Sequence, residues 1–178
     1  SSDLAISFMV LTPNLSANRF PAAKRARNPD PDAYTALVAS LQDRFWTVAI
    51  ASCRPKKEWL VEPLIADVDY TDGQLEFGEL AALVAMAHCV ITPPGMATVL
   101  AQAVGTPCIT VFGGYEDRRS FAGGADYAPW LPIEPIKPCP CWREDCAGDK
   151  TIDLPAALAQ VDAQSAQARR HYPNLSPF

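Results

Sequence analysis

The sequence predicts an α/β protein with a doubly wound, mostly parallel sheet. Short apolar runs that are typical of strands alternate with stretches of helical spacing along the chain. No internal repeat interrupts the alternation. Strands that alternate with helices form a parallel sheet with right-handed crossovers, and ligands of such sheets bind beyond the carboxyl ends of the strands.

The first half of the chain contains three expected strands and two expected helices. The apolar runs predict strands at Leu4–Thr12, Trp46–Ser52 and Val68–Tyr70. Helical spacing predicts helices at Asp32–Asp43 and Lys56–Ala66, and Pro63 within the second is expected to kink or shorten it.

The second half has the clearer pattern. We expect helices at Phe77–Ala87, Gly95–Val104 and Leu154–His171, and strands at Cys89–Thr92 and Cys108–Phe112. Gly105 is expected to cap the middle helix in the left-handed conformation. We treat residues 1–178 as one domain with a long Pro/Gly/Cys-rich loop at 113–150 and a C-terminal helix at about 154–171.

Charge and hydropathy exclude two classes of function. The net charge of −5 argues against a general nucleic-acid binder, and no apolar run reaches the ~20 residues that a membrane span needs. Nothing resembles a signal peptide, and single cysteines in strands suit a reducing compartment, so we expect a cytoplasmic protein. Eight of the fifteen basic residues lie between Arg19 and Lys57, so an anion could bind there locally.

Two turns at strand ends are candidate ligand sites. In the first, Thr92 ends a strand, Pro93 and Pro94 stiffen its exit, and Gly95 opens a helix whose first amides, at Met96 and Ala97, suit a phosphate. In the second, the pair Gly113 and Gly114 precedes Tyr115 and leaves the backbone free to bend under a ligand. Taken singly, each segment is equally compatible with a plain connecting turn.

Taken together, these segments resemble glycosyltransferase family nine, the heptosyltransferase family. The resemblance is carried, in order and spacing, by Phe77-Gly78-Glu79-Leu80-Ala81-Ala82-Leu83, Thr92-Pro93-Pro94-Gly95, Val104-Gly105-Thr106-Pro107 and Phe112-Gly113-Gly114, with a Cys-rich loop at 138–146 after them. It covers residues 77–146 well and is faint before them.

The resemblance implies the C-terminal, Rossmann-like half of a GT-B glycosyltransferase, which holds a nucleotide-diphosphate sugar. The acceptor and the catalytic carboxylate would belong to an N-terminal half or a partner chain, so the catalytic residues are unknown. It further implies roles for residues of the early basic loop and of the second strand's end. The residues implied to contact the donor are Arg25, Arg27, Glu58, Thr92, Pro94, Gly95, Met96, Ala97, Gly113, Gly114 and Tyr115.

The chain departs from the family pattern at three places. The family's acidic residue falls on Pro94, its glycine pair becomes Gly95-Met96, and its histidine falls on Val99. A degenerate, non-catalytic module that serves structure or assembly is therefore the alternative to an active enzyme. A different Rossmann-like enzyme is a third possibility, against which the absence of a G-x-G-x-x-G motif after the first strand weighs.

Three cysteines, Cys139, Cys141 and Cys146, raise the question of a metal. Their C-x-C-x4-C spacing has one pair closer than structural zinc sites usually have, and no histidine is near in sequence to supply a fourth ligand. The spacing therefore favours a packed loop, and we expect no metal and no cofactor, with the donor sugar nucleotide as a substrate.

Overall fold

The computed structural model describes residues 8–11, 15–16, 28–42, 45–50, 59–60, 66–71, 73–123, 128–143 and 146–171. Its main sheet has six strands, and every neighbouring pair in it is parallel. The spatial order is β5-β3-β1-β6-β7-β8. The strands are β1 (Phe8–Leu11), β3 (Trp46–Ile50), β5 (Val68–Tyr70), β6 (Cys89–Thr92), β7 (Cys108–Val111) and β8 (Trp130–Ile133).

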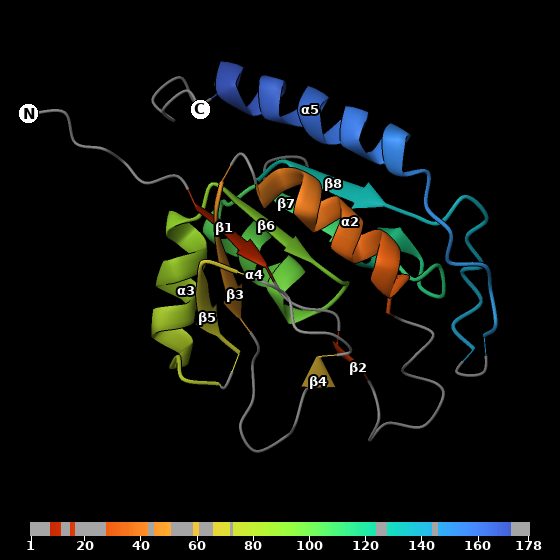
Figure 1. Cartoon of the computed structure of the whole chain (residues 1–178), viewed down its shortest axis with the longest axis horizontal. Coiled ribbons are helices and arrows are strands. Elements are labelled where there is room, and N and C mark those ends of the chain that lie inside the picture. The colour runs from red at the N-terminus through yellow and green to blue at the C-terminus, as the bar shows by residue number, and fades with distance from the viewer. Residues whose placement is uncertain are drawn as a thin grey trace, which may run out of the picture.

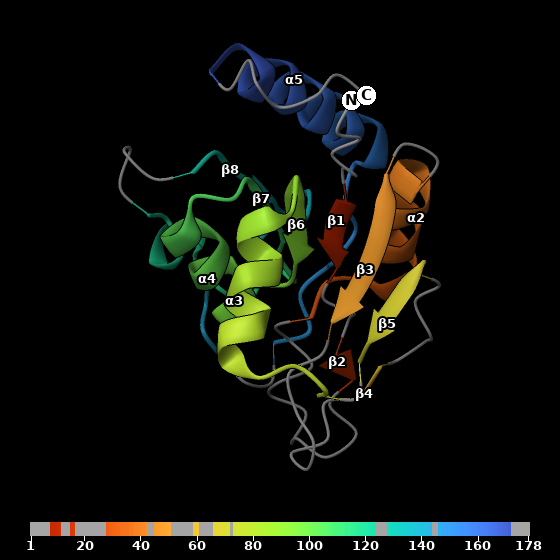
Figure 2. The ribbon, with the colours of Figure 1, turned by 90° about the vertical axis from the view of Figure 1, so that its left-hand side faces the viewer.

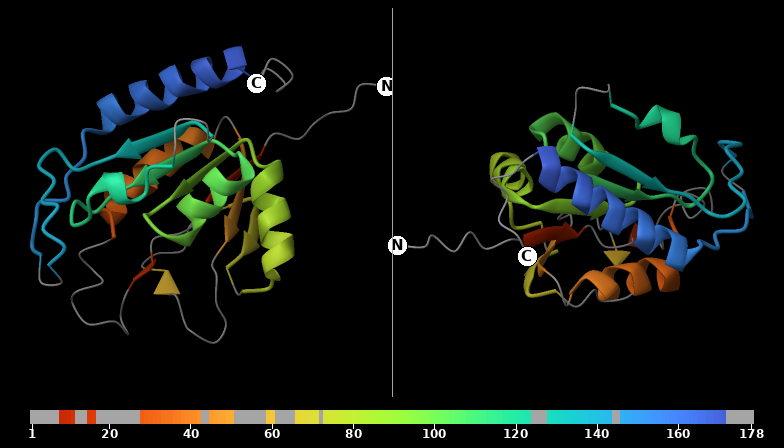
Figure 3. Two further views of the ribbon diagram at one scale, coloured as in Figure 1. Left: turned by 180° about the vertical axis from the view of Figure 1, so that it is seen from behind. Right: turned by 90° about the horizontal axis from the view of Figure 1, so that it is seen from above.

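Helices cover both faces of this sheet, as a doubly wound fold requires. Figures 1 and 2 show α3 and α4 on one face and α2 on the other, and the left view of Figure 3 shows α5 along the top of the molecule. The buried residues Ala157 and Val161 of α5 belong to the same apolar cluster as those of α2. The fold class predicted from the sequence is thereby confirmed. The helices are α2 (Pro31–Gln42), α3 (Phe77–Met86), α4 (Met96–Val104) and α5 (Leu154–His171), with a short 3-10 turn, η1, at Arg118–Ser120.

The two faces of the sheet bury two separate apolar clusters. Alternate residues of one strand serve opposite clusters: Val90 of β6 packs toward α3 and α4, while Ile91 packs toward α2 and α5. This alternation is the expected consequence of the two-residue period of a strand. The α2 and α5 cluster contains Tyr34, Leu37, Val38, Leu41, Phe45, Ile91, Ile109, Val111, Ile133, Ile152, Ala157 and Val161.

Buried threonines fasten the α3 and α4 face by hydrogen bonds. The Thr110 hydroxyl of β7 lies 3.2 Å from the Thr98 hydroxyl of α4 and accepts from Trp130 Nε1 of β8 at 2.9 Å. The Thr106 hydroxyl donates to the carbonyl of Val84 in α3 at 2.7 Å. Because buried polar groups are costly unless paired, these bonds fix which helix face meets the sheet.

The helix ends follow local sequence signals. Glu76 and Glu79 form a capping box at the start of α3, in which the Glu76 amide donates to Glu79 Oε2 at 2.9 Å. Gly105 ends α4 with φ +83°, as expected from its position after the last apolar residue of the helix.

Two sequence expectations differ from the structure. The helix expected at Lys56–Ala66 is wrong at Trp59–Leu60, which form strand β4 and pair antiparallel with β2 (Leu15–Ser16). The prolines at 55 and 63 leave too short a window for a stable helix, and strand pairing prevails. The expected loop at 113–150 contains η1 and the whole of strand β8, which pairs with β7 although its segment has a proline.

That proline, Pro132, is compatible with β8 because β8 is an edge strand. The amides of Cys108 in β7 and of Phe112, the residue after β7, donate to the carbonyls of Pro129 and Ile133, so odd-numbered positions of the β8 segment face β7. Position 132 therefore turns its nitrogen toward the open edge, where the ladder loses no hydrogen bond.

Within the described part of the chain, no helix has both the length and the apolar character that a bilayer crossing requires.

Candidate functional site

The strand order places the candidate site at the topological switch point of the sheet. Counting only strands of the main sheet in chain order, the spatial order is 3-2-1-4-5-6, and the winding reverses between β1 and β6. In open α/β sheets the crevice at this reversal, beyond the carboxyl ends of the strands, is where ligands bind. The turn that leaves β6 at Thr92 therefore lies at the favoured position.

The turn from Thr92 to Ala97 begins at a buried, hydrogen-bonded residue and reaches the surface at the start of α4. Thr92 is 2% exposed, and its hydroxyl donates to the carbonyl of Pro93 at 2.8 Å. Gly95 is the N-cap of α4, with extended backbone and no side-chain hydrogen bond at the cap. Within the described part of the chain, a Cβ added at Gly95 would meet no atom within 4 Å, so a side chain has room at this position.

The first amides of α4 are the polar groups that this turn offers. The first helical bond runs from Val99 N–H to the carbonyl of Gly95, at 3.4 Å. The amides of Met96 and Ala97 precede it and have no acceptor within the helix. With the positive end of the helix dipole, they form a place suited to an anion. Met96 is 47% exposed, so the helix start is open to solvent.

The second candidate turn leaves the neighbouring strand at the same edge. The register pairs Thr92 of β6 with Thr110 of β7, so both turns start at similar heights. Gly113 and Gly114 are buried and Tyr115 is half-buried. Gly114 has φ +83°, and a Cβ there would lie 2.9 Å from Cγ of Pro135. Glycine is therefore required at position 114 by conformation and by packing.

A distant part of the chain holds the second turn in place. The carbonyl of Gly114 accepts from the amide of Cys139 at 2.8 Å, and the carbonyl of Tyr115 accepts from the amide of Trp142 at 3.2 Å. The rings of Tyr115 and Trp142 meet edge to face with centroids 5.7 Å apart. The Cys-rich segment thus lies directly against the glycine turn, a contact that sequence reasoning did not foresee.

Three sequence-predicted residues, Arg25, Arg27 and Glu58, lie outside the described residues, so their roles stay predictions. Sequence reasoning also passed over Glu116, which follows Tyr115 and is 3% exposed. Among the described residues it is the only buried carboxylate. The signal that could have found Glu116 is an acid two residues after a glycine pair at the carboxyl edge of the sheet.

The charged residues after the glycine turn are engaged with each other. Asp117 accepts from the amide and the guanidinium of Arg119, and these contacts lower the pKa of Asp117 to about 2. Arg118 forms an ion pair with Glu134 at 3.3 Å. These exposed pairs organise the loop surface rather than the turn itself.

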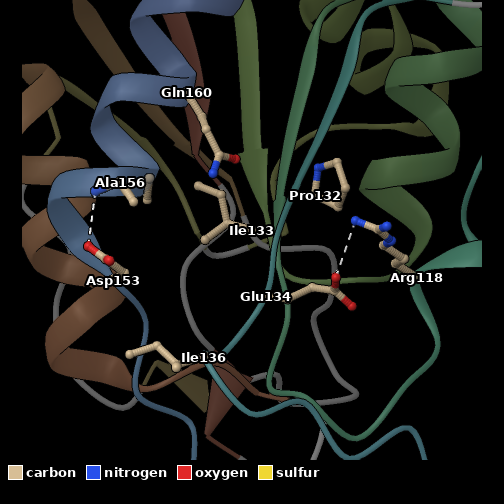
Figure 4. Close-up of a pocket in the computed structure, with 9 residues that line it drawn as sticks. Arg118, Pro132, Ile133, Glu134, Ile136, Asp153, Ala156 and Gln160 are labelled. Carbon is tan, nitrogen blue, oxygen red and sulfur yellow. Dashed lines mark hydrogen bonds and ion pairs between the residues drawn. The ribbon is translucent and has the colours of Figure 1, made fainter.

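A pocket of about 220 Å³ lies beside this loop, along β8 and the start of α5. Figure 4 shows Asp153 and Gln160 on its α5 side and the Arg118–Glu134 pair on its other side. None of the sequence-predicted donor residues lines it. The pocket and the two glycine turns are therefore made by different residues.

The cysteines differ in their surroundings. In strand β7, burial raises the pKa of Cys108 to about 12, and burial raises that of Cys89 in β6 as well. Both are protonated near neutral pH and serve as small apolar groups. Cys139, Cys141 and Cys146 instead gather near the surface, with sulfur atoms all within 4.8 Å of one another. A backbone hydrogen bond from Arg143 lowers the pKa of Cys141.

The strand order and the glycine-opened helix at the switch point together define a domain of the doubly wound α/β class. The sequence profile of glycosyltransferase family 9 (heptosyltransferase) matches residues 16–134, more than half of the chain. The chain belongs to this family. No curated protein matches the sequence significantly.

Several solved structures share the fold of this chain. The chain resembles Escherichia coli ADP-heptose lipopolysaccharide heptosyltransferase II, with a TM-score of 0.56 and 16% identity over 95% of this chain and 49% of that one. It resembles E. coli heptosyltransferase WaaC with ADP at a TM-score of 0.55 and 14% identity, over 90% and 45%. It also resembles the iron-containing dodecameric glycosyltransferase TibC of enterotoxigenic E. coli, at 0.61 and 18%, over 97% and 48%.

At these identities the likeness establishes the fold. The chain spans about half the length of each of these structures. The resemblance inferred from the sequence motifs is thus confirmed at the level of family and fold.

Proposed function

We propose that this chain is the donor-binding half of a glycosyltransferase, which transfers a sugar from a nucleotide diphosphate to a hydroxyl of a glycan or a lipid-linked glycan. The observation that carries the proposal is the open, glycine-capped start of α4 at the switch point of the sheet. The structure of WaaC, which has this fold, was determined with ADP. ADP is therefore the first nucleotide to test.

In this proposal the chain acts on the leaving group. The amides of Met96 and Ala97 and the dipole of α4 bind the diphosphate and stabilise the negative charge that grows on it as the sugar departs. The turn at Gly113 and Gly114 lets backbone approach the donor, and Arg25 or Arg27 adds positive charge. Helix amides and side chains supply the stabilisation, so the transfer step itself uses no metal.

The acceptor hydroxyl needs a base and a binding surface. We assign both to an N-terminal half or a partner chain, because the matched glycosyltransferases are about twice as long as this chain. Donor binding is therefore the activity to seek in this chain by itself.

A non-catalytic module that serves structure or assembly is the second candidate, and one observation favours it. At the donor turn Pro94 is buried, and Val99, one turn into α4, is 57% exposed and apolar. Neither supplies a polar group to a phosphate or sugar. Such a module would keep the fold and bind nucleotide diphosphates weakly or not at all.

Calorimetric titration of the chain with ADP, UDP, GDP and CDP at low salt distinguishes the two candidates. Micromolar binding of one of them supports the donor half and names the base. The Gly95→Asp and Gly95→Asn variants then locate the site. Both side chains are good N-caps and meet open space, so both variants keep or slightly raise the thermal stability.

Only the aspartate puts a negative charge where the diphosphate is proposed to bind. Gly95→Asp is expected to weaken diphosphate binding at least about 10-fold more than Gly95→Asn does. Gly78→Ala, at another open glycine position on α3, is the control and leaves affinity unchanged. Equal affinities of the Asp and Asn variants would show that the diphosphate does not bind at the start of α4. No heat with any nucleotide, from a folded chain, would favour the non-catalytic module.

A further inference from the structure

We propose that Cys139, Cys141 and Cys146 bind one thiolate-preferring transition-metal ion, of which Zn²⁺ is the first to test. The three sulfur atoms come from the segment between β8 and α5, drawn in blue tones at the right edge of Figure 1. The proposal concerns a structural site in this segment and is independent of the transfer reaction.

The first support is the convergence of the sulfur atoms. All three lie within 4.8 Å of one another. Sulfurs that share a tetrahedral ion at the usual bond length of about 2.3 Å lie roughly 3.8 Å apart. Small side-chain rotations would close this difference. The sequence spacing, which argued against zinc, could not reveal that a folded loop brings the third thiol to the first two.

The second support is the backbone that produces the convergence. The amide of Cys141 donates to the carbonyl of Cys139 at 2.6 Å, and the amide of Cys146 donates to that of Arg143 at 3.1 Å. Trp142 between them has φ +56°, a conformation that bulky residues rarely adopt. These two hydrogen bonds and the left-handed backbone of Trp142 accompany the convergence of the three thiols.

The third support is that burial does not explain these cysteines. Cys139 is exposed and Cys141 and Cys146 are only half-buried, and every residue from Ile136 to Pro140 is exposed. Cys108, which does act as an apolar core residue, is fully buried. A segment with so little apolar burial gains its order from other contacts, and a bound metal is a common source in small loops.

Gly148 lies directly against the cluster. A Cβ at Gly148 would lie 3.3 Å from the sulfur of Cys146, so the backbone closes over the cluster from one side. Binding of M²⁺ would release one proton from each thiol that is protonated beforehand.

Three protein sulfurs leave one tetrahedral position, and among the described residues no further His, Cys, Asp or Glu joins the group. The ion would hold the loop in the shape that donates the amides of Cys139 and Trp142 to Gly114 and Tyr115. The site would therefore stabilise the second glycine turn from behind.

Elemental analysis and metal titration of the whole chain test this. The chain is purified under reducing conditions, stripped with a chelator and titrated with Zn²⁺ or Co²⁺. We expect one ion per chain and, with Co²⁺, a sulfur-to-cobalt charge-transfer band with the visible absorption of a tetrahedral site. Elemental analysis of the unstripped chain identifies the ion that the site carries after expression.

Two cysteine variants locate the site. Cys141→Ser and Cys146→Ser are expected to weaken Zn²⁺ binding by more than about 100-fold, since even changes beyond the direct ligands reach that size. Cys89→Ala, a strand cysteine outside the cluster, keeps the stoichiometry and the spectrum. Circular dichroism checks that each variant is folded. Hydrogen exchange of peptides covering 136–148 is expected to slow on metal addition in the wild type and not in Cys141→Ser.

Three outcomes would overturn the proposal. One is a folded, fully reduced chain with no saturable binding of Zn²⁺ or Co²⁺. Another is a disulfide between two of the three cysteines in the freshly purified chain, shown by mass spectrometry without reductant. The last is metal binding that persists unchanged in a variant with all three cysteines replaced by serine.

Discussion

Gly114 and Gly105 share a backbone conformation but differ in their neighbours. Both have φ +83°, yet a Cβ at Gly105 would meet no atom within 4 Å, whereas one at Gly114 would press on Pro135 at 2.9 Å. A comparison of the two positions therefore distinguishes the free energy lost to a left-handed backbone from the free energy lost to a steric clash, at the same φ angle.

Replacement of each glycine by alanine measures these two costs. Gly105→Ala is expected to lower the free energy of unfolding by about 1 kcal/mol, the usual penalty of a left-handed residue. Gly114→Ala adds an overpacking penalty of about 1–3 kcal/mol. Urea denaturation of both variants checks the order. Equal losses would mean that Pro135 moves aside without cost.

Asp67 couples stability to pH. Its carboxylate accepts from the amide and the hydroxyl of Thr47 at 2.7 and 2.8 Å, and these bonds lower its pKa below 3.8. A lowered pKa in the folded state contributes stability above the unfolded value, and this stability is lost as the pH falls through the folded pKa.

Asp67→Asn is therefore expected to destabilise the chain at neutral pH by about 1 kcal/mol, a modest value because water competes at this exposed carboxylate. The difference from the wild type should shrink below pH 3.8. Denaturation curves over a pH series measure it. A difference that is the same at every pH would show that Asp67 acts through shape rather than charge.

At the scale of elements, one phenol joins a helix to the centre of the sheet. Tyr34 of α2 is fully buried, and its hydroxyl donates to the carbonyl of Ile91 in β6 at 3.1 Å. Tyr34→Phe keeps the packing and removes this bond, so a loss of about 1 kcal/mol is expected. Tyr70→Phe on the edge strand β5 is the control and should change little. Thermal unfolding of both variants makes the comparison.

The elements that local chemistry specifies could be predicted from the sequence. The apolar spacing in α3 and the glycine after α4 gave these helices within one residue of their observed ends. Strand β8 could not be predicted, because its pairing with β7 depends on an edge position that no local pattern encodes. The segment at Trp59–Leu60 failed for the same reason, since its partner is β2, far away in the chain.

The candidate site likewise has parts that the sequence predicts and parts that only the folded structure reveals. Gly95 and the pair Gly113 and Gly114 were found because each follows a strand directly, and parallel strands end at a common edge. The contact of Gly114 with Pro135 and the meeting of three sulfur atoms are products of tertiary folding. Spacing in the sequence says little about either.

At the scale of the whole molecule, one sheet serves two apolar clusters, so the two should unfold together. Val84 of α3 belongs to one cluster and Val161 of α5 to the other, and both are nearly inaccessible. Val84→Ala and Val161→Ala are each expected to cost about 2 kcal/mol. Each should lower the midpoint of a single transition, seen alike by circular dichroism and by tryptophan fluorescence.

A separate, earlier transition in the Val161→Ala variant would contradict this expectation. It would mean that α5 and its contacts come apart while the rest of the sheet remains folded.

The open edge of β8 bears on how this chain behaves at high concentration. An incoming strand from a second copy would need an unbroken row of donors to extend the sheet, and Pro132 removes one from the middle of that row. The opposite edge, β5, carries the exposed carboxylate of Asp69. A proline at one border and a negative charge at the other are the devices by which sheets resist growth into fibrils. Each edge of the sheet therefore carries a feature that disfavours pairing with a strand of a second copy.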